Sequence, residues 1–202
     1  FKCPLIIFRW FFVMIKNKLS VWRAFRSQVE VQDCLFLGLV ILLSVVLYVW
    51  DLGFYSDDWH FLKILNFSED RSLSGLIRPF FLESPDHWTR PVKAIYQAVQ
   101  YWLFGLHPLG FHLVNAAVLM AGIVLFYWVL RELSQNRWLA LAVPMVYGLL
   151  PHYSTDRFWY AACQANLSMA LYFLSLYSDL RMVKAKHKWM WGWKILSLTS
   201  LL

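Results

Sequence analysis

The sequence predicts an all-α fold: a polytopic bundle of transmembrane helices. Hydrophobic residues make up 60% of the chain and charged residues only 15%, whereas a soluble domain is about half apolar and about a quarter charged. Apolar runs of the length needed to cross about 30 Å of hydrocarbon recur along the chain. Lys and Arg gather in alternate connections between these runs. Together these three observations favour lipid over water as the surrounding medium.

Five segments are predicted to span the membrane: residues 34–52, 108–130, 138–152, 161–180 and 189–202. The first holds only one charged side chain, Asp51 at its far end, and its length as a helix, about 28 Å, matches the hydrocarbon thickness. The fifth stops inside an apolar run, and the chain begins with Phe1 rather than Met. We therefore expect an N-terminal fragment of a longer protein.

The distribution of Lys and Arg predicts which connections face the cytoplasm. Cations precede the first span, lie between the second and third, and follow the fourth, which puts all three sets on one side of the membrane. Because cytoplasmic flanks carry an excess of cations, the N-terminus is expected inside. The outer loop, residues 53–107, and the loop around Asp156 then face outward. The net charge of +7 is explained by these flanks, so no nucleic-acid partner is expected.

Residues 1–33 form a cytoplasmic or interfacial segment, and residues 34–202 the transmembrane domain. Residues 5–26 mix apolar side chains with spaced cations, which is typical either of a helix lying in the interface or of an ordinary juxtamembrane tail. Cys3, Cys34 and Cys163 have no spacing typical of a disulfide framework or a zinc site.

Two short amphipathic segments in the outer loop are predicted to be helices lying in the headgroup plane. Residues 59–67 carry polar side chains at steps of three, and residues 92–104 have polar side chains on one face. Both are too short to cross the membrane, and both contain the Trp or Tyr residues that favour an interface. They would frame a cavity at the outer leaflet.

Asp57 and Asp58 are adjacent carboxylates just beyond the first span. Their mutual repulsion raises one pKa when the surroundings are partly dry. A carboxylate held there can deprotonate an acceptor hydroxyl or ligate a divalent cation. The alternative is a solvated turn or a helix cap.

The order of these features resembles the GT-C glycosyltransferases, polytopic enzymes that take sugars from polyprenyl-phosphate carriers. They include protein O-mannosyltransferases and aminoarabinose transferases. The similarity covers residues 35–180. It rests on the motifs Tyr55-Ser56-Asp57-Asp58-Trp59, Arg90-Pro91, Phe104-Gly105, His112-Leu113-Val114-Asn115, and the segment from Leu150-Pro151-His152 to Thr155-Asp156 and Trp159. In the last segment the mannosyltransferase branch usually has His-Pro and Thr-Glu, so this chain departs from that pattern.

The resemblance implies that Asp57 is the catalytic base and that Asp58 supports it or helps to hold a metal such as Mg²⁺ or Mn²⁺. It implies a phosphate-binding arginine, for which Arg90 is the first choice and Arg78 and Arg157 are alternatives. The Arg90-Pro91 pair is equally explained as a helix start with proline at the first position.

Further substrate-binding candidates are His112, Asn115, Asp156 and Arg157. Because His112 and Asn115 are three residues apart, they lie on one helix face. They either line the cavity or make hydrogen bonds between helices, and the second interpretation is favoured.

The function implied is transfer of a sugar from a polyprenyl-phosphate carrier to a hydroxyl of a protein, lipid or glycan. The site would lie on the periplasmic, extracellular or ER-lumenal face. The alternatives are a polytopic transporter and a non-catalytic membrane scaffold subunit. Transporters place ionisable residues at mid-membrane, and the predicted spans are almost free of them, which favours chemistry at the interface.

Overall fold

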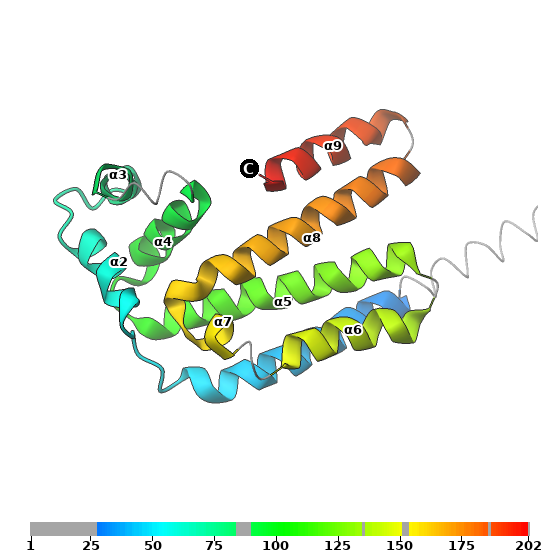
Figure 1. Ribbon diagram of the computed structural model, residues 1–202, viewed down its shortest axis with the longest axis horizontal. Helices are drawn as coiled ribbons and strands as arrows, with labels where there is room; N and C mark the ends of the chain where they lie inside the picture. Colours follow the sequence, from blue (N-terminus) through cyan, green and yellow to red (C-terminus); the bar gives the residue numbers. More distant parts are fainter. Residues whose placement is uncertain (1–27, 84–89, 135, 151–153, 186, 202) are drawn as a thin grey trace, which may run out of the picture. The chain divides into compact units, whose positions relative to one another are not determined.

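The computed structural model describes residues 28–83, 90–134, 136–150, 154–185 and 187–201, and no strand occurs among them. All their regular elements are helices, which confirms the all-α prediction (Figure 1). The chain divides into two compact units, residues 1–36 and 37–202. The predicted interfacial segment 5–26 and the Pro151-His152 pair lie outside the described residues.

Two helices are long and apolar enough to cross a membrane: Gln28–Val49, and α5, Pro108–Leu133. The first begins earlier than the predicted span and ends before Asp51. On this helix a stripe at helical spacing is buried, and most of the intervening apolar side chains are exposed. The buried stripe is Leu37, Ile41, Val45 and Val49, and the exposed side chains include Leu39, Leu43 and Leu47. An exposed apolar face of this kind suits contact with lipid.

The other three predicted spans are also helices. They are α6 (Arg137–Leu149, 13 residues), α8 (Cys163–Lys184, 22 residues) and α9 (His187–Leu201, 15 residues). At 1.5 Å per residue α6 is only about 20 Å long. Whether these three helices cross the membrane stays a prediction.

Helix α5 packs along α8, and α8 packs along α9, while α6 covers another side of α5 (Figure 1). The α5–α8 contact is close because Gly122 lies against Ala170. At the far end Glu132 of α5 accepts hydrogen bonds from Arg181, at 3.1 Å, and Lys184, at 2.6 Å, both on α8. These contacts fix α8, whose first turn carries part of the candidate site.

The segment predicted to be the outer loop, residues 53–107, contains three helices: α2 (Asp57–Asn66), α3 (Leu73–Glu83) and α4 (Pro91–Phe104). The prediction of helices at residues 59–67 and 92–104 is confirmed, and their orientation in a membrane stays a prediction. Helix α3 was not predicted. Two short elements, α7 (Ser154–Phe158) and a 3₁₀ helix, η3 (Tyr160–Ala162), lead into α8.

A hydrophobic core holds the outer-loop helices against the first turn of α5 and the start of α8. Its fully buried members include Leu65, Phe80, Ala98, Phe111 and Tyr160. Phe111 and Tyr160 meet edge to face, with ring centroids 4.9 Å apart. The first turns of α2, α4 and α8 are thereby held in a fixed relation to one another.

Candidate functional site

Asp57 lies in the first turn of α2 and is exposed. The Ser56 hydroxyl donates to its Oδ1 at 3.3 Å. Ser56 itself has φ 41°, the one non-glycine residue with positive φ in the described chain. Such backbone strain is uncommon and gathers at functional sites. Asp57 therefore keeps an accessible carboxylate on a strained turn.

Asp58 is fully buried. Its Oδ2 accepts the Tyr55 backbone N–H at 2.8 Å, and its Oδ1 accepts the Ala161 backbone N–H at 2.7 Å. Burial raises the pKa of this carboxyl, and the two N–H groups oppose that rise. Asp58 thus joins the start of α2 to η3, and we interpret it as a residue that positions Asp57.

The Asp pair does not by itself fit a divalent cation. Mg²⁺ and Ca²⁺ take about six or more oxygen ligands, and both Asp58 oxygens already accept backbone N–H groups. Among the described residues, no group of three or more His, Cys, Asp or Glu side chains is placed to hold a metal. We derive no step through a cation.

Two cations come from the start of α4. Arg90 precedes Pro91, the first residue of the helix, as the helix-start interpretation predicts. Arg90 is exposed and its Nη1 donates to Gln164 Oε1 on α8 at 3.1 Å. Lys93 is only 7% exposed, and its Nζ lies 4.3 Å from the centroid of the Phe61 ring.

The Lys93 ammonium is an unusual group to bury. Burial lowers its pKa, the Arg90 charge lowers it further, and the Asp57 carboxylate raises it. Among the described residues, no carboxylate forms an ion pair with Lys93. Because an unpaired buried charge is costly, an anion that reached this ammonium would be bound favourably.

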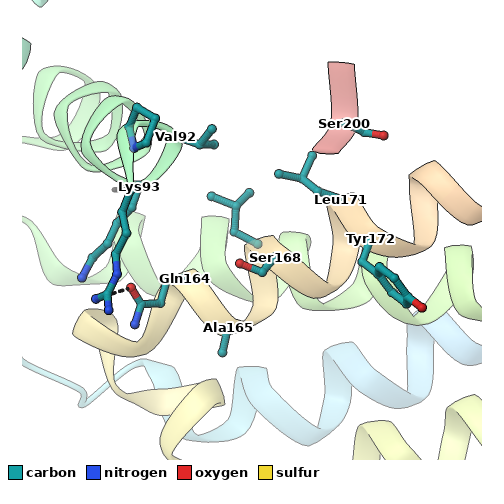
Figure 2. A pocket seen from close by; sticks show the side chains of 11 residues that line it. Val92, Lys93, Gln164, Ala165, Ser168, Leu171, Tyr172 and Ser200 are labelled. Atoms are coloured by element: carbon teal, nitrogen blue, oxygen red, sulfur yellow. Dashed lines mark hydrogen bonds between the residues drawn. The ribbon is translucent and has the colours of Figure 1, made fainter. Parts of the chain in front are cut away.

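A cavity of about 470 Å³ opens between the start of α4 and the first turns of α8, and one residue of α9 borders it. Figure 2 shows Lys93 on α4 above the first turn of α8, where the dashed line marks the hydrogen bond from Arg90 to Gln164, with Leu171 and Ser200 farther along α8 and α9. Arg90 and Lys93 belong to one end, and the rest of the lining is largely apolar or hydroxylic. We call this space the α4–α8 cavity.

His112 and Asn115 are both buried and make contacts between elements. His112 Nε2 lies 3.2 Å from the Gly53 carbonyl oxygen. Asn115 Oδ1 accepts the Tyr96 hydroxyl at 2.6 Å and the Gln100 amide at 3.4 Å, both from α4. Neither residue borders the α4–α8 cavity. These contacts are of the kind that the interhelical interpretation expects, and a substrate-binding role of either residue stays a prediction.

Arg78 and Arg157 do not border the α4–α8 cavity. Arg78 is exposed on α3. Arg157 is half-buried on α7, burial lowers its pKa, and its Nη2 has no hydrogen-bond partner among the described residues. The backbone of Asp156 belongs to α7, but its side chain lies outside what the structure describes.

Sequence reasoning missed Lys93 and Gln164. Lys93 follows Arg90 by three residues, so the two share a helix face, and that spacing was a usable signal. Gln164 is separated from Arg90 by 74 residues, and nothing local in the sequence indicates their contact.

No protein-family model, curated protein or solved structure matches this chain. The functional argument therefore depends on the chemistry of the residues that the fold brings together.

Proposed function

We propose that this chain is the membrane part of a glycosyltransferase that moves a sugar from a polyprenyl-phosphate carrier to an acceptor hydroxyl. The observation that carries the proposal is the α4–α8 cavity, where two cations meet an apolar lining. The resemblance to the GT-C enzymes points to the same chemistry. Two helices able to span a membrane are consistent with a lipid-linked substrate.

The cationic end of the cavity suits a phosphate. Arg90 offers a planar guanidinium, which forms paired hydrogen bonds to phosphate oxygens. Lys93 offers a compact ammonium that is already removed from water. Because this ammonium has already lost most of its contact with water, less desolvation accompanies the binding of an anion, and the attraction is stronger.

The apolar part of the cavity suits an isoprenoid chain. Val92, Leu167 and Leu171 belong to its lining, together with the ring of Tyr172. Each buried CH₂ of a lipid contributes about 0.8 kcal/mol. A ligand with an anionic head and a long hydrocarbon tail satisfies both ends at once.

Asp57 is the proposed general base. The acceptor oxygen attacks the anomeric carbon, its proton passes to the Asp57 carboxylate, and the bond from the anomeric carbon to the phosphate oxygen breaks. Polyprenyl phosphate leaves with the bonding electrons, and Arg90 and Lys93 stabilise its charge. A well-placed base contributes about a hundred- to ten-thousand-fold in rate.

Binding of polyprenyl phosphate to the intact protein in lipid nanodiscs tests the proposal. Lys93→Met and Arg90→Gln should each weaken binding at least tenfold, because each removes one cation from the phosphate. Lys63→Met and Arg78→Gln are matched controls, since both residues are exposed and lie outside the cavity. Equal affinity in all four variants would contradict the proposal.

A further inference from the structure

A second pocket of about 380 Å³ lies beside the turn that begins α2. Leu52, Tyr55 and Ser56 line it from the segment before the helix. Thr155, Phe158 and Trp159 line it from α7 and the residue that follows. None of these six residues borders the α4–α8 cavity. We call this space the aromatic pocket.

The lining of the aromatic pocket combines rings with hydroxyl groups. Tyr55, Phe158 and Trp159 provide aromatic rings, and Tyr55, Ser56 and Thr155 provide hydroxyls. Among the described residues that line it, no side chain is charged, in contrast to the α4–α8 cavity with Arg90 and Lys93. Aromatic faces pack against the C–H faces of a sugar ring, and side-chain hydroxyls exchange hydrogen bonds with its hydroxyls.

The size of the pocket agrees with a small ligand. Binding sites for small molecules occupy about 300–1,000 Å³, and this pocket is near the lower end of that range. One or two sugar rings fit such a space, whereas an extended peptide would need a longer groove.

Ser56 connects the pocket to the proposed base. It lines the pocket, and its hydroxyl donates to Asp57 Oδ1 at 3.3 Å. Its positive φ, 41°, places this strained residue at the junction. A hydroxyl of a ligand held in the pocket would approach the Asp57 carboxylate from the Ser56 side.

We propose that the aromatic pocket binds a sugar ring of the acceptor, so that the acceptor is a glycan or glycolipid rather than a peptide. This inference rests on the proposed function, because it assigns the acceptor of the same reaction. The carrier occupies the α4–α8 cavity, the acceptor sugar occupies the aromatic pocket, and Asp57 accepts the proton of the acceptor hydroxyl.

Saturation-transfer NMR on the intact protein in nanodiscs tests the inference, with methyl α-glycosides of glucose, mannose and galactose as probes. At least one glycoside should show transfer. Trp159→Leu removes a ring and should abolish the signal, and Thr155→Val removes a hydroxyl at nearly constant shape and should reduce it several-fold. Trp102→Leu is the control, since Trp102 is 57% exposed on α4 and outside both spaces. A thermal unfolding midpoint within about two degrees of the parent checks that each variant is folded.

The remaining arms separate the acceptor from the donor sugar, and the inference from the function. If the glycoside still gives its NMR signal when sugar-bearing polyprenyl phosphate fills its own site, the acceptor assignment is supported. If the NMR signal of the glycoside is lost with sugar-bearing carrier but kept with sugar-free carrier, the pocket binds the donor sugar, and the acceptor assignment is overturned. If no glycoside gives an NMR signal with a protein that binds polyprenyl phosphate, this inference is overturned and the proposed function is not. If a glycoside gives an NMR signal but the protein does not bind the carrier, the proposed function is contradicted, while sugar binding in the aromatic pocket is supported.

Discussion

Asp57 and Asp58 are neighbours on one helix turn, and a rotation of roughly 100° between successive residues sends them to opposite environments. One carboxylate is exposed, and the other is buried between Tyr55 and Ala161. The buried one fixes the backbone on both sides, so the exposed one is held in place while its carboxylate stays accessible. In the proposed mechanism, Asp58 thereby positions the turn and Asp57 carries out the chemistry.

Replacement of the two aspartates by asparagine should separate these roles in stability. The new amide of the Asp58→Asn variant would present its NH₂ group to one of the two backbone N–H donors, so this substitution should cost about 1–3 kcal/mol. Asp57→Asn changes an exposed side chain and should alter the free energy of unfolding by no more than about 0.5 kcal/mol. Thermal unfolding of the purified protein in detergent measures both, and equal effects would refute the division.

Transfer activity, in contrast to stability, should depend directly on Asp57. Asp57→Asn keeps the shape of the side chain but removes its basicity, so transfer should fall about a hundred- to ten-thousand-fold while carrier binding is unchanged. The assay is turnover with polyprenyl-phosphate sugar in membranes of matched expression. Parental turnover in this variant would exclude Asp57 as the base.

Lys93 should give carrier binding a characteristic pH dependence. Burial lowers the pKa of its ammonium, so on raising the pH this lysine loses its charge before an ordinary lysine does, below about 10.4. The phosphate of the carrier has a second pKa near 6, so its charge no longer changes above pH 8. Affinity should therefore fall as the pH rises through the lowered pKa of Lys93.

The control for this titration is Lys93→Met, in which this fall in affinity should disappear. The stability of the protein without ligand should depend on pH in the opposite direction. Between the lowered pKa and the ordinary one, the folded state binds fewer protons than the unfolded state, so stability rises with pH there. A parent protein whose affinity has the same pH profile as that of Lys93→Met would remove Lys93 from the phosphate site.

At the scale of elements, amphipathic spacing was sufficient to predict α2 and α4, whereas α3 was missed. Pro79 lies inside α3, and an internal proline argues against a helix because its nitrogen cannot donate to the carbonyl four residues earlier. Here that carbonyl oxygen, Gly75 O, lies 3.2 Å from the Ser68 hydroxyl, whose single proton it shares with the Asp70 carbonyl oxygen at 3.0 Å. The compensating donor comes from outside the helix, where no local pattern reveals it.

Ser68 and Pro79 should therefore be coupled. Ser68→Ala leaves the part-buried Gly75 carbonyl without this donor and should cost about 0.5–1.5 kcal/mol. In a Pro79→Ala background the helix supplies its own N–H, so the same substitution should cost clearly less. A double-mutant cycle from thermal or denaturant unfolding measures the difference, and a coupling energy of zero would contradict this explanation of α3.

The candidate site was predictable in part for the same reason. Short motifs and the charge distribution led to the prediction of Asp57 and Arg90 as site residues and of a site on the outer face, and these stay predictions. The pairing of Arg90 with Gln164, and the burial of Asp58 against Ala161, join segments 74 and 103 residues apart. Long-range contacts of this kind depend on the packing of the whole outer loop, which the sequence does not display.

For the whole molecule, the question is how many helices cross the membrane. Helix α8 is long enough, but it contains polar residues, and among them Asn166, Ser175 and Ser178 are buried. Ser175 Oγ lies 3.1 Å from Ser197 Oγ on α9. Polar side chains that bond to neighbouring helices are compatible with a membrane interior, so the lower hydropathy of α8 does not argue against a crossing.

Sidedness tests the whole arrangement at once. Three crossings, by α5, α6 and α8, separate Glu69 from Val183 in the proposed topology, so the two residues should lie on opposite faces. Both are exposed, and Val183 is 81% exposed beside the cations Arg181 and Lys184. In intact cells, an impermeant thiol reagent should label Glu69→Cys beyond the parent protein, and label Val183→Cys only after permeabilisation.

The crossing with the least support is that of α6, because its helix covers only about 20 Å of a hydrocarbon layer of about 30 Å. If α6 merely enters and returns, both cysteines react from outside. That result would place the cations after α8 on the outer face, against the positive-inside rule, and would undo the topology on which the outer-face site depends.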